Sequence, residues 1–131
     1  MSEQNGNAVI LLAEDEPVVR NFVHTALMRA GYQVFSAADG AEAIQLSLRY
    51  EGRIDLLLTD VKMPRMVGPE LARAILRERP RIRILLMTGE SSGEIPEVLK
   101  PELLRKPFLP KHLLQRIEEA LRSPNAQLGE I

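Results

Sequence analysis

The chain has 131 residues, of which 45% are hydrophobic and 27% charged, and this length and composition suit one globular domain. Its formal net charge of −1 gives no overall field that would attract nucleic acid or an anionic membrane. It has no cysteine and no apolar run near the roughly 18 residues of a membrane span, so we expect a cytoplasmic protein without disulfides, thiolate metal sites or a membrane partner.

Short apolar runs alternate with helical patterns along the chain, which is typical of βα units and a parallel sheet. Several of these runs are continuously apolar, as expected for strands that helices cover on both faces. We predict strands near residues 8–13, 33–37, 54–59, 82–87 and 102–105.

Four helices are predicted between and after these strands. Pro17 suits the first position of a helix, and apolar side chains follow it at three- and four-residue spacing until Gly31. Asp39 and Glu42 resemble a capping box that opens a second helix, which extends to about residue 49. The third helix begins near residue 68, and the last runs from residue 110 to residue 122.

Five strands with alternating helices predict an α/β fold, a doubly wound parallel sheet of strand order 2-1-3-4-5. The domain should span residues 8–122, between a disordered N-terminus (1–7) and a flexible tail (123–131). Ligands of such sheets bind outside the carboxyl ends of the strands, at the switch point between the first and third strands. We therefore expect the functional site at that edge.

Polar side chains stand at the carboxyl ends of the predicted strands. They are Glu14 and Asp15 after the first strand, Asp60 after the third, Thr88 after the fourth and Lys106 after the fifth. Three carboxylates in one partly buried cleft repel one another, so without a cation at least one of them should have a raised pKa. Mg²⁺ removes this conflict because it prefers carboxylate, water and phosphate oxygens as ligands.

This set of groups matches the needs of phosphoryl transfer. A carboxylate such as Asp60 can attack phosphorus and form an aspartyl phosphate. The transferring group carries negative charge on three oxygens, and the protein contributes positioning and electrostatic stabilisation. Mg²⁺, Lys106 and the Thr88 hydroxyl can each contact one of these oxygens.

Five motifs occur in a fixed order along the chain. They are Leu12-Ala13-Glu14-Asp15-Glu16-Pro17 with Arg20, Asp39-Gly40, Asp60-Val61-Lys62-Met63-Pro64 with Gly68, Thr88-Gly89, and Lys106-Pro107-Phe108. In this order they resemble the receiver domain of the two-component response regulator family, which has a flavodoxin-like fold. The resemblance covers roughly residues 8–122.

The resemblance implies that Asp60 accepts a phosphoryl group from the phosphohistidine of a histidine kinase or phosphotransfer protein. Asp15, Asp60 and the backbone carbonyl of Lys62 would bind Mg²⁺ directly, and Glu14 would act through water. The response would be a changed surface that binds a downstream partner of unknown identity.

The resemblance also implies roles for the residues around the acceptor. Lys106 would pair with the phosphoryl group, and Thr88 would swing toward it. A cis peptide bond is expected between Lys106 and Pro107. Lys62 and Glu90 lie two residues beyond the acceptor and the threonine, and we predict that they tune the lifetime of the phosphoryl group.

The chain departs from the family in the parts that transmit a signal. The family usually has Tyr or Phe three residues before its lysine, and this position is Leu103, which offers no flipping ring. Only residues 89–105 separate the threonine from the lysine, and prolines stand at positions 96 and 101. We predict a fourth helix that is shortened or missing.

We expect a signalling domain that catalyses only its own phosphorylation and dephosphorylation. It would respond by binding a partner, forming a homodimer or relaying phosphoryl groups, whether free-standing or part of a larger hybrid kinase. One alternative is a Mg²⁺-dependent phosphatase acting through an aspartyl phosphate, although Val61-Lys62 offers no second acidic group behind Asp60. The other is a pseudo-receiver, a binding module that is independent of phosphate.

Overall fold

The computed structural model describes residues 8–89 and 103–122 of the chain. Strands and helices alternate along these residues. The strands are β1 (Val9–Ala13), β2 (Gln33–Ala37), β3 (Leu56–Asp60), β4 (Arg83–Thr88) and β5 (Leu103–Arg105). The helices are α2 (Pro17–Arg29), α3 (Gly40–Arg49), α4 (Gly68–Glu78) and α5 (Pro110–Arg122).

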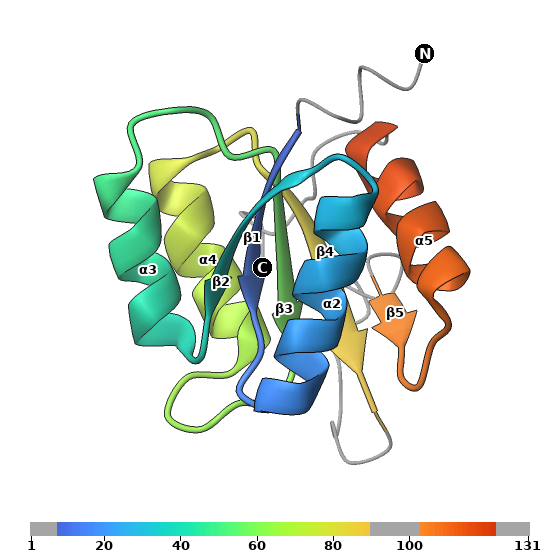
Figure 1. Cartoon of the computed structure of the whole chain (residues 1–131). Coiled ribbons are helices and arrows are strands. Elements are labelled where there is room, and N and C mark those ends of the chain that lie inside the picture. Colours follow the sequence, from blue (N-terminus) through green and yellow to red (C-terminus); the bar gives the residue numbers. More distant parts are fainter. Residues whose placement is uncertain (1–7, 90–102, 123–131) are drawn as a thin grey trace.

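The strands form one parallel sheet of order β2-β1-β3-β4-β5, which confirms the predicted doubly wound topology (Figure 1). Because β1 lies between β2 and β3, the sheet grows first to one side of β1 and then to the other. The register pairs Ala13 of β1 with Thr59 of β3. The residues that follow them, Glu14 and Asp60, are therefore level with one another at the switch point.

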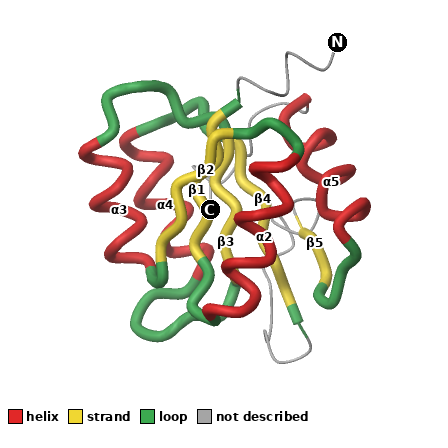
Figure 2. The backbone as a smooth tube through the Cα atoms, viewed as in Figure 1, coloured by secondary structure: helices red, strands yellow, loops and turns green. Residues whose placement is uncertain are grey.

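Helices cover both faces of the sheet (Figure 2). α3 and α4 pack on one face, and α2 and α5 pack on the other. In β1, Leu11 enters the core beneath α3 and α4, whereas Ile10 and Leu12 enter the core beneath α2 and α5. The central strands are thus buried on both faces, which explains why their sequences are continuously apolar.

The helix ends follow local signals in the sequence. Gly31 has φ of 100°, a left-handed conformation that favours glycine, and it follows the end of α2. The Asp39 carboxylate accepts a hydrogen bond from the Glu42 N–H at 2.8 Å, and the Glu42 carboxylate accepts one from the Ala38 N–H at 2.7 Å. The predicted capping box is therefore present, with its return bond one residue before the cap.

Two strands extend one residue further at their carboxyl ends than the sequence predicts. Asp60 pairs with Met87, and Thr88 pairs with Arg105, so both polar residues belong to the sheet. Differences of one or two residues at element ends are common. Here the difference means that strand backbone, paired with β4, positions the candidate acceptor.

Three expectations concern residues outside the described ranges and remain predictions. They are the disordered N-terminus, the flexible tail and the shortened or missing fourth helix between residues 89 and 105. Within residues 8–89 and 103–122 there are four helices, α2 to α5. None of these four is long and apolar enough to cross a membrane.

Arg79 joins the end of α4 to the end of α3. Its guanidinium donates to the hydroxyl and the carbonyl oxygen of Ser47, each at 2.9 Å. It also donates to the carbonyl oxygens of Tyr50 and Gly52, at 2.6 and 2.8 Å. The last turn of a helix leaves carbonyl groups without intrahelical partners, and Arg79 supplies partners for α3 and the loop that follows it.

Arg79→Met should lower the free energy of unfolding by about 2 kcal/mol, because it leaves several carbonyl groups without this donor. Arg77→Met is the matched control, since Arg77 is an exposed arginine in the last turn of the same helix. Its effect should stay within about 0.5 kcal/mol. Urea unfolding measures both, and equal effects would contradict the role assigned to Arg79.

Candidate functional site

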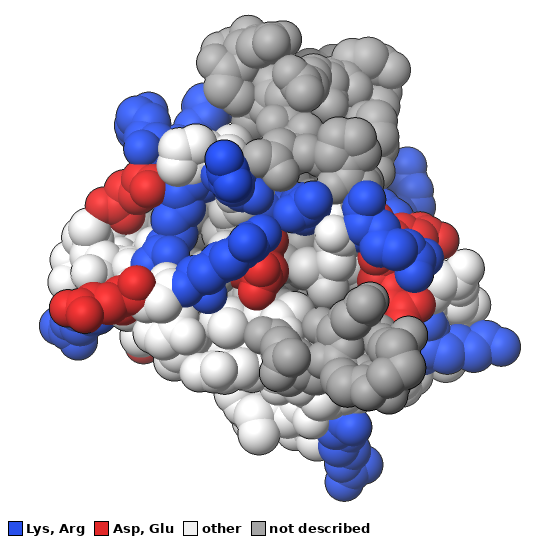
Figure 3. Space-filling model, turned by 90° about the horizontal axis from the view of Figure 1, so that it is seen from above, with Lys and Arg blue, Asp and Glu red and all other residues white. Residues whose placement is uncertain are grey.

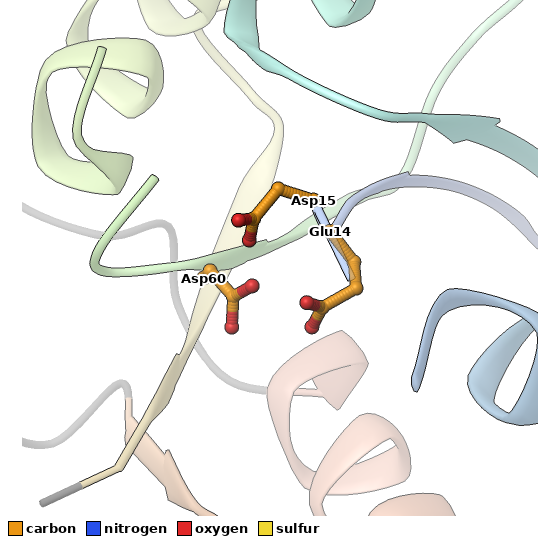
Figure 4. Close-up of side chains that lie close together, drawn as sticks. All are labelled: Glu14, Asp15 and Asp60. Carbon is orange, nitrogen blue, oxygen red and sulfur yellow. The ribbon is translucent and has the colours of Figure 1, made fainter. Parts of the chain in front are cut away.

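Three carboxylates converge at the carboxyl ends of β1 and β3 (Figure 4). Glu14 and Asp15 follow β1, and Asp60 is the last residue of β3. One oxygen from each carboxylate lies within 4.8 Å of the others, a spacing that one metal ion can bridge. Glu14 and Asp60 are buried, at 1% and 4% exposure, whereas Asp15 is exposed. The structure thus brings together the three carboxylates that the sequence places at strand ends.

These carboxylates line an open cleft of about 490 Å³ at the edge of the sheet. The segments that follow β1, β3, β4 and β5 all contribute to it, so four strand ends meet at one opening. Besides the three carboxylates, the lining residues are Glu16, Pro17, Lys62, Gly89 and Lys106. The cleft lies where a doubly wound sheet binds its ligands.

Lys106 bridges the two buried carboxylates. Its Nζ lies 3.0 Å from Glu14 Oε1 and 2.6 Å from Asp60 Oδ1. A buried carboxylate without a partner is costly, and this ammonium partly offsets the cost for both. Lys106 brings one positive charge to Glu14 and Asp60 and so does not neutralise all three carboxylates, which is why the cleft favours a further cation.

Burial raises the pKa of Asp60 to about 8, and the nearby Glu14 carboxylate adds to this rise. Lys106 acts in the opposite direction, because its positive charge favours the ionised form of Asp60. Burial alone would lower the pKa of Lys106, but the contacts with Asp60 and Glu14 outweigh it and raise that pKa. The charge conflict expected from the sequence is therefore concentrated on Asp60, where a cation would relieve it.

The other candidate residues differ in their placement. Thr88 is buried, and its hydroxyl donates a hydrogen bond to the carbonyl oxygen of the next residue, Gly89, at 3.3 Å. Lys62 is exposed and lines the cleft. The peptide bond between Lys106 and Pro107 is cis, as the resemblance implies. Glu90, the second candidate for a tuning role, lies outside the described residues.

Gly68 holds the backbone of Asp60 from the start of α4. Its N–H donates to the Val61 carbonyl oxygen at 2.7 Å. A Cβ at this position would overlap the Asp60 carbonyl oxygen, so only glycine allows this approach. The sequence marks Gly68 as part of a motif and as the start of a helix, but it does not reveal this contact. The available signal was a glycine that stands shortly after the motif beginning with Asp60.

Two arginines hold strands that carry the site. Arg20 donates to the Glu14 carbonyl oxygen at 2.9 Å. Arg116 of α5 donates to the Leu103 carbonyl oxygen through two nitrogens, at 3.0 and 3.2 Å. The Leu103 side chain, which stands where the family usually has a ring, is half-buried against the core beneath α3 and α4. The backbone of β5 is thus tied to α5.

Comparison with known proteins identifies the family. The family model described as "Response regulator receiver domain" matches residues 10–118. The chain belongs to the response regulator receiver domain family. The resemblance stated from the motifs is therefore confirmed, as is the flavodoxin-like receiver fold. Receiver domains are signalling domains of two-component systems.

The receiver domain is similar to proteins of different lengths. It is 39% identical to the response regulator receiver protein CpdR of Brucella abortus (strain 2308), over 86% of the chain and 95% of CpdR. It is 35% identical to the sensor kinase CckA of the same organism, over 92% of the chain but only 13% of CckA. The structure of the Vibrio cholerae chemotaxis protein CheY4 superposes with a TM-score of 0.74 and 31% identity, over 86% of the chain and 98% of CheY4.

Asp60→Asn should raise the free energy of unfolding at neutral pH in the absence of divalent metal, by on the order of 2 kcal/mol. The pKa of Asp60 in the folded protein, about 8, lies above its ordinary value. The folded state therefore binds this proton more tightly than the unfolded chain does. Stability should fall as the pH rises from about 4 toward about 8, and the Asp60→Asn variant should lack this contribution.

Urea unfolding in EDTA at several pH values within this range measures the effect. Asp39→Asn is a control at the same edge of the sheet. The pKa of Asp39 is lowered, chiefly by the hydrogen bond from the Glu42 N–H, so neutralising this residue should give no gain. A gain in both variants, or in neither, would show that the charge of Asp60 does not oppose folding.

Proposed function

We propose that this receiver domain accepts a phosphoryl group on Asp60 from the phosphohistidine of a histidine kinase or phosphotransfer protein. One observation carries the proposal: Asp60 is buried at the end of β3, contacts Lys106 and lines an open cleft. An Asp60 oxygen would form a bond to phosphorus while the bond from phosphorus to the histidine nitrogen breaks. The leaving nitrogen keeps that electron pair, and the product is an aspartyl phosphate.

The neighbouring groups suit the transferred phosphoryl group. Lys106 Nζ lies 2.6 Å from Asp60 Oδ1, so it would remain close to an oxygen of a phosphoryl group carried there. Thr88 would turn its hydroxyl from the Gly89 carbonyl toward a second oxygen. Lys62, which lines the cleft, would act with Glu90 to limit the approach of water and so tune the lifetime of the acyl phosphate.

We propose Mg²⁺ as the cofactor because the donor set consists of hard, anionic oxygens. Asp15 and Asp60 would hold the ion directly, together with the Lys62 carbonyl oxygen. Glu14 would act through water, since its Oε1 already lies 3.0 Å from Lys106 Nζ. When bound, Mg²⁺ neutralises negative charge on Asp60 and on the phosphoryl oxygens.

The donor protein needs a surface beside the cleft, and the starts of α2 and α5 supply one. Val18, Phe22 and Leu109 are 77%, 42% and 59% exposed, although side chains of this kind are more often buried. Phe22 also lines a groove of about 570 Å³ between α2 and α5. Because Pro17 lines the acceptor cleft, a protein seated on this surface would reach Asp60. We assign the surface to the phosphohistidine-bearing partner.

The proposed response is a change in a partner-binding surface, with homodimerisation as one form of it. A phosphoryl group adds about −1.5 to −2 charges. It would enter a cleft that already holds three carboxylates, so the loops around it would rearrange. The domain would catalyse only its own phosphorylation and dephosphorylation.

Incubation with Mg²⁺ and acetyl phosphate should add one phosphoryl group, measured as a mass increase of the intact protein. Asp60→Asn should abolish the adduct because it removes the nucleophile, and EDTA should prevent it. Lys106→Ala should lower the rate by about tenfold or more, because it removes a stabilising charge beside the phosphoryl group. Glu42→Gln, an exposed acidic residue of α3, serves as the control and should be phosphorylated normally.

The other outcomes decide between the remaining functions. Steady turnover of phosphomonoesters would favour a Mg²⁺-dependent phosphatase. It would contradict the expectation that the domain catalyses only its own phosphorylation and dephosphorylation. An unmodified protein after prolonged incubation would favour a pseudo-receiver that binds its partner without phosphate.

Phe22→Ala should slow transfer from a phosphohistidine protein by about tenfold, because it removes an apolar anchor for the donor. Its rate with acetyl phosphate should be unchanged, since the cleft itself is intact. Met28→Ala is the matched control, because Met28 is exposed near the other end of the same helix. If Phe22→Ala slows both donors equally, the residue acts on the cleft or on folding, and the docking surface is wrong.

A further inference from the structure

The amino edge of the sheet, opposite the acceptor cleft, is rich in arginine. Figure 3 looks down on this edge from the top of Figure 1, and blue side chains gather there with red ones among them. Each described helix ends with an arginine in its last turn, and the loops that enter β3 and β4 add others. The net charge of −1 therefore does not reveal that arginines gather at this edge, away from the three carboxylates of the cleft.

Helix dipoles explain only part of this pattern. A basic side chain in the last turn compensates the partial negative charge of a helix C-terminus, which accounts for Arg49 and Arg77. Arg53 and Arg81 lie in loops and are exposed, so this reason does not apply to them. Arg53 contacts Asp55 at 2.8 Å, yet 67% of its side chain remains exposed. We call these four residues, Arg49, Arg53, Arg77 and Arg81, the arginine edge.

Arg53 and Arg81 line the same hollow in this edge. It has a volume of about 330 Å³, and its other lining residues are Ile54, Arg79, Pro80 and Ile82. Ile54 and Ile82 belong to the buried core, and Arg79 is held by its hydrogen bonds to the end of α3. The two exposed guanidinium groups therefore stand on a rigid base, which lowers the entropic cost of binding a ligand between them.

The chemistry of the hollow favours carboxylates. A guanidinium group binds a carboxylate through two parallel hydrogen bonds. The volume lies at the lower end of the range for small-molecule pockets, about 300 to 1,000 Å³, which suits one or two inserted side chains. Glu51 and Glu78 are exposed near Arg49 and Arg77 in the sequence, so the edge is not a continuous basic surface of the kind that follows a phosphate backbone. The six described lining residues include no aromatic ring on which a nucleic acid base could stack.

We propose that the arginine edge binds an acidic segment of a protein partner, with one carboxylate side chain seated between Arg53 and Arg81. The hollow lies before the starts of β3 and β4, whereas Asp60 is the last residue of β3. A partner held there leaves the acceptor cleft open, so it binds the phosphorylated and unphosphorylated domain alike. The arginine edge is a constant attachment point, separate from the surface that responds to phosphorylation.

A short synthetic peptide of alternating glutamate and leucine tests this proposal in a titration of the ¹⁵N-labelled chain. Amide signals around residues 53 and 81 should shift, and the affinity should fall as salt is added. A peptide of alternating glutamine and leucine should cause no such shifts. In the Arg53→Gln/Arg81→Gln variant the dissociation constant for the acidic peptide should rise by about tenfold. Glutamine is chosen because a carboxylate at position 53 would repel Asp55.

The matched control is Arg29→Gln/Arg122→Gln, which removes the same charge from helices on the other face of the sheet. It should change the dissociation constant by less than about twofold. Asp60→Asn should bind the peptide as the unsubstituted protein does. Equal weakening in both double variants, shifts confined to other residues, or tighter binding of a single-stranded oligonucleotide of equal charge would overturn the proposal.

Discussion

The contact of Lys106 with Glu14 and Asp60 is the interaction on which the site depends. Parallel strands bring the two carboxylates level with one another, and the Lys106 ammonium between them partly offsets the cost of burying two negative charges side by side. The lysine lies 92 residues from Glu14, so this bridge forms only when β1, β3 and β5 are in one sheet. The complete fold is therefore needed to gather the charges.

Burying these carboxylates lowers the stability of the fold while it prepares the site for a cation. Burial raises the pKa of Asp60 to about 8, so its ionised form opposes folding more than an ordinary surface aspartate would. The apolar cores on both faces of the sheet stabilise the fold against this cost. A metal-free cleft is therefore less favourable than one that holds a cation. A bound cation, or a group that bonds to the Asp60 carboxylate and removes its negative charge, would reduce the repulsion between the buried carboxylates. Sites that carry perturbed groups are commonly functional for this reason.

Much of the fold and part of the site could be predicted from the sequence, because their signals are local. Continuous apolar runs, Pro17 and the capping box at Asp39 mark the elements, and the rule for parallel sheets then brings Glu14 to Asp60. The same rule brings Lys106 to this edge, whereas the cis bond was implied by the family resemblance. The direct contact of Lys106 with Glu14 and the four bonds of Arg79 were missed. They join distant elements through side-chain geometry, which periodicity does not encode.

The packing of Gly68 against the Asp60 carbonyl has a consequence for protein engineering. A site of this kind can be regarded as a set of side chains to be grafted onto any sheet with the right strand order. Here the peptide that carries Asp60 is in contact with the first turn of α4, at a distance that admits no side chain. A working transplant would therefore have to include that turn, and a random library would find position 68 as intolerant of substitution as position 60.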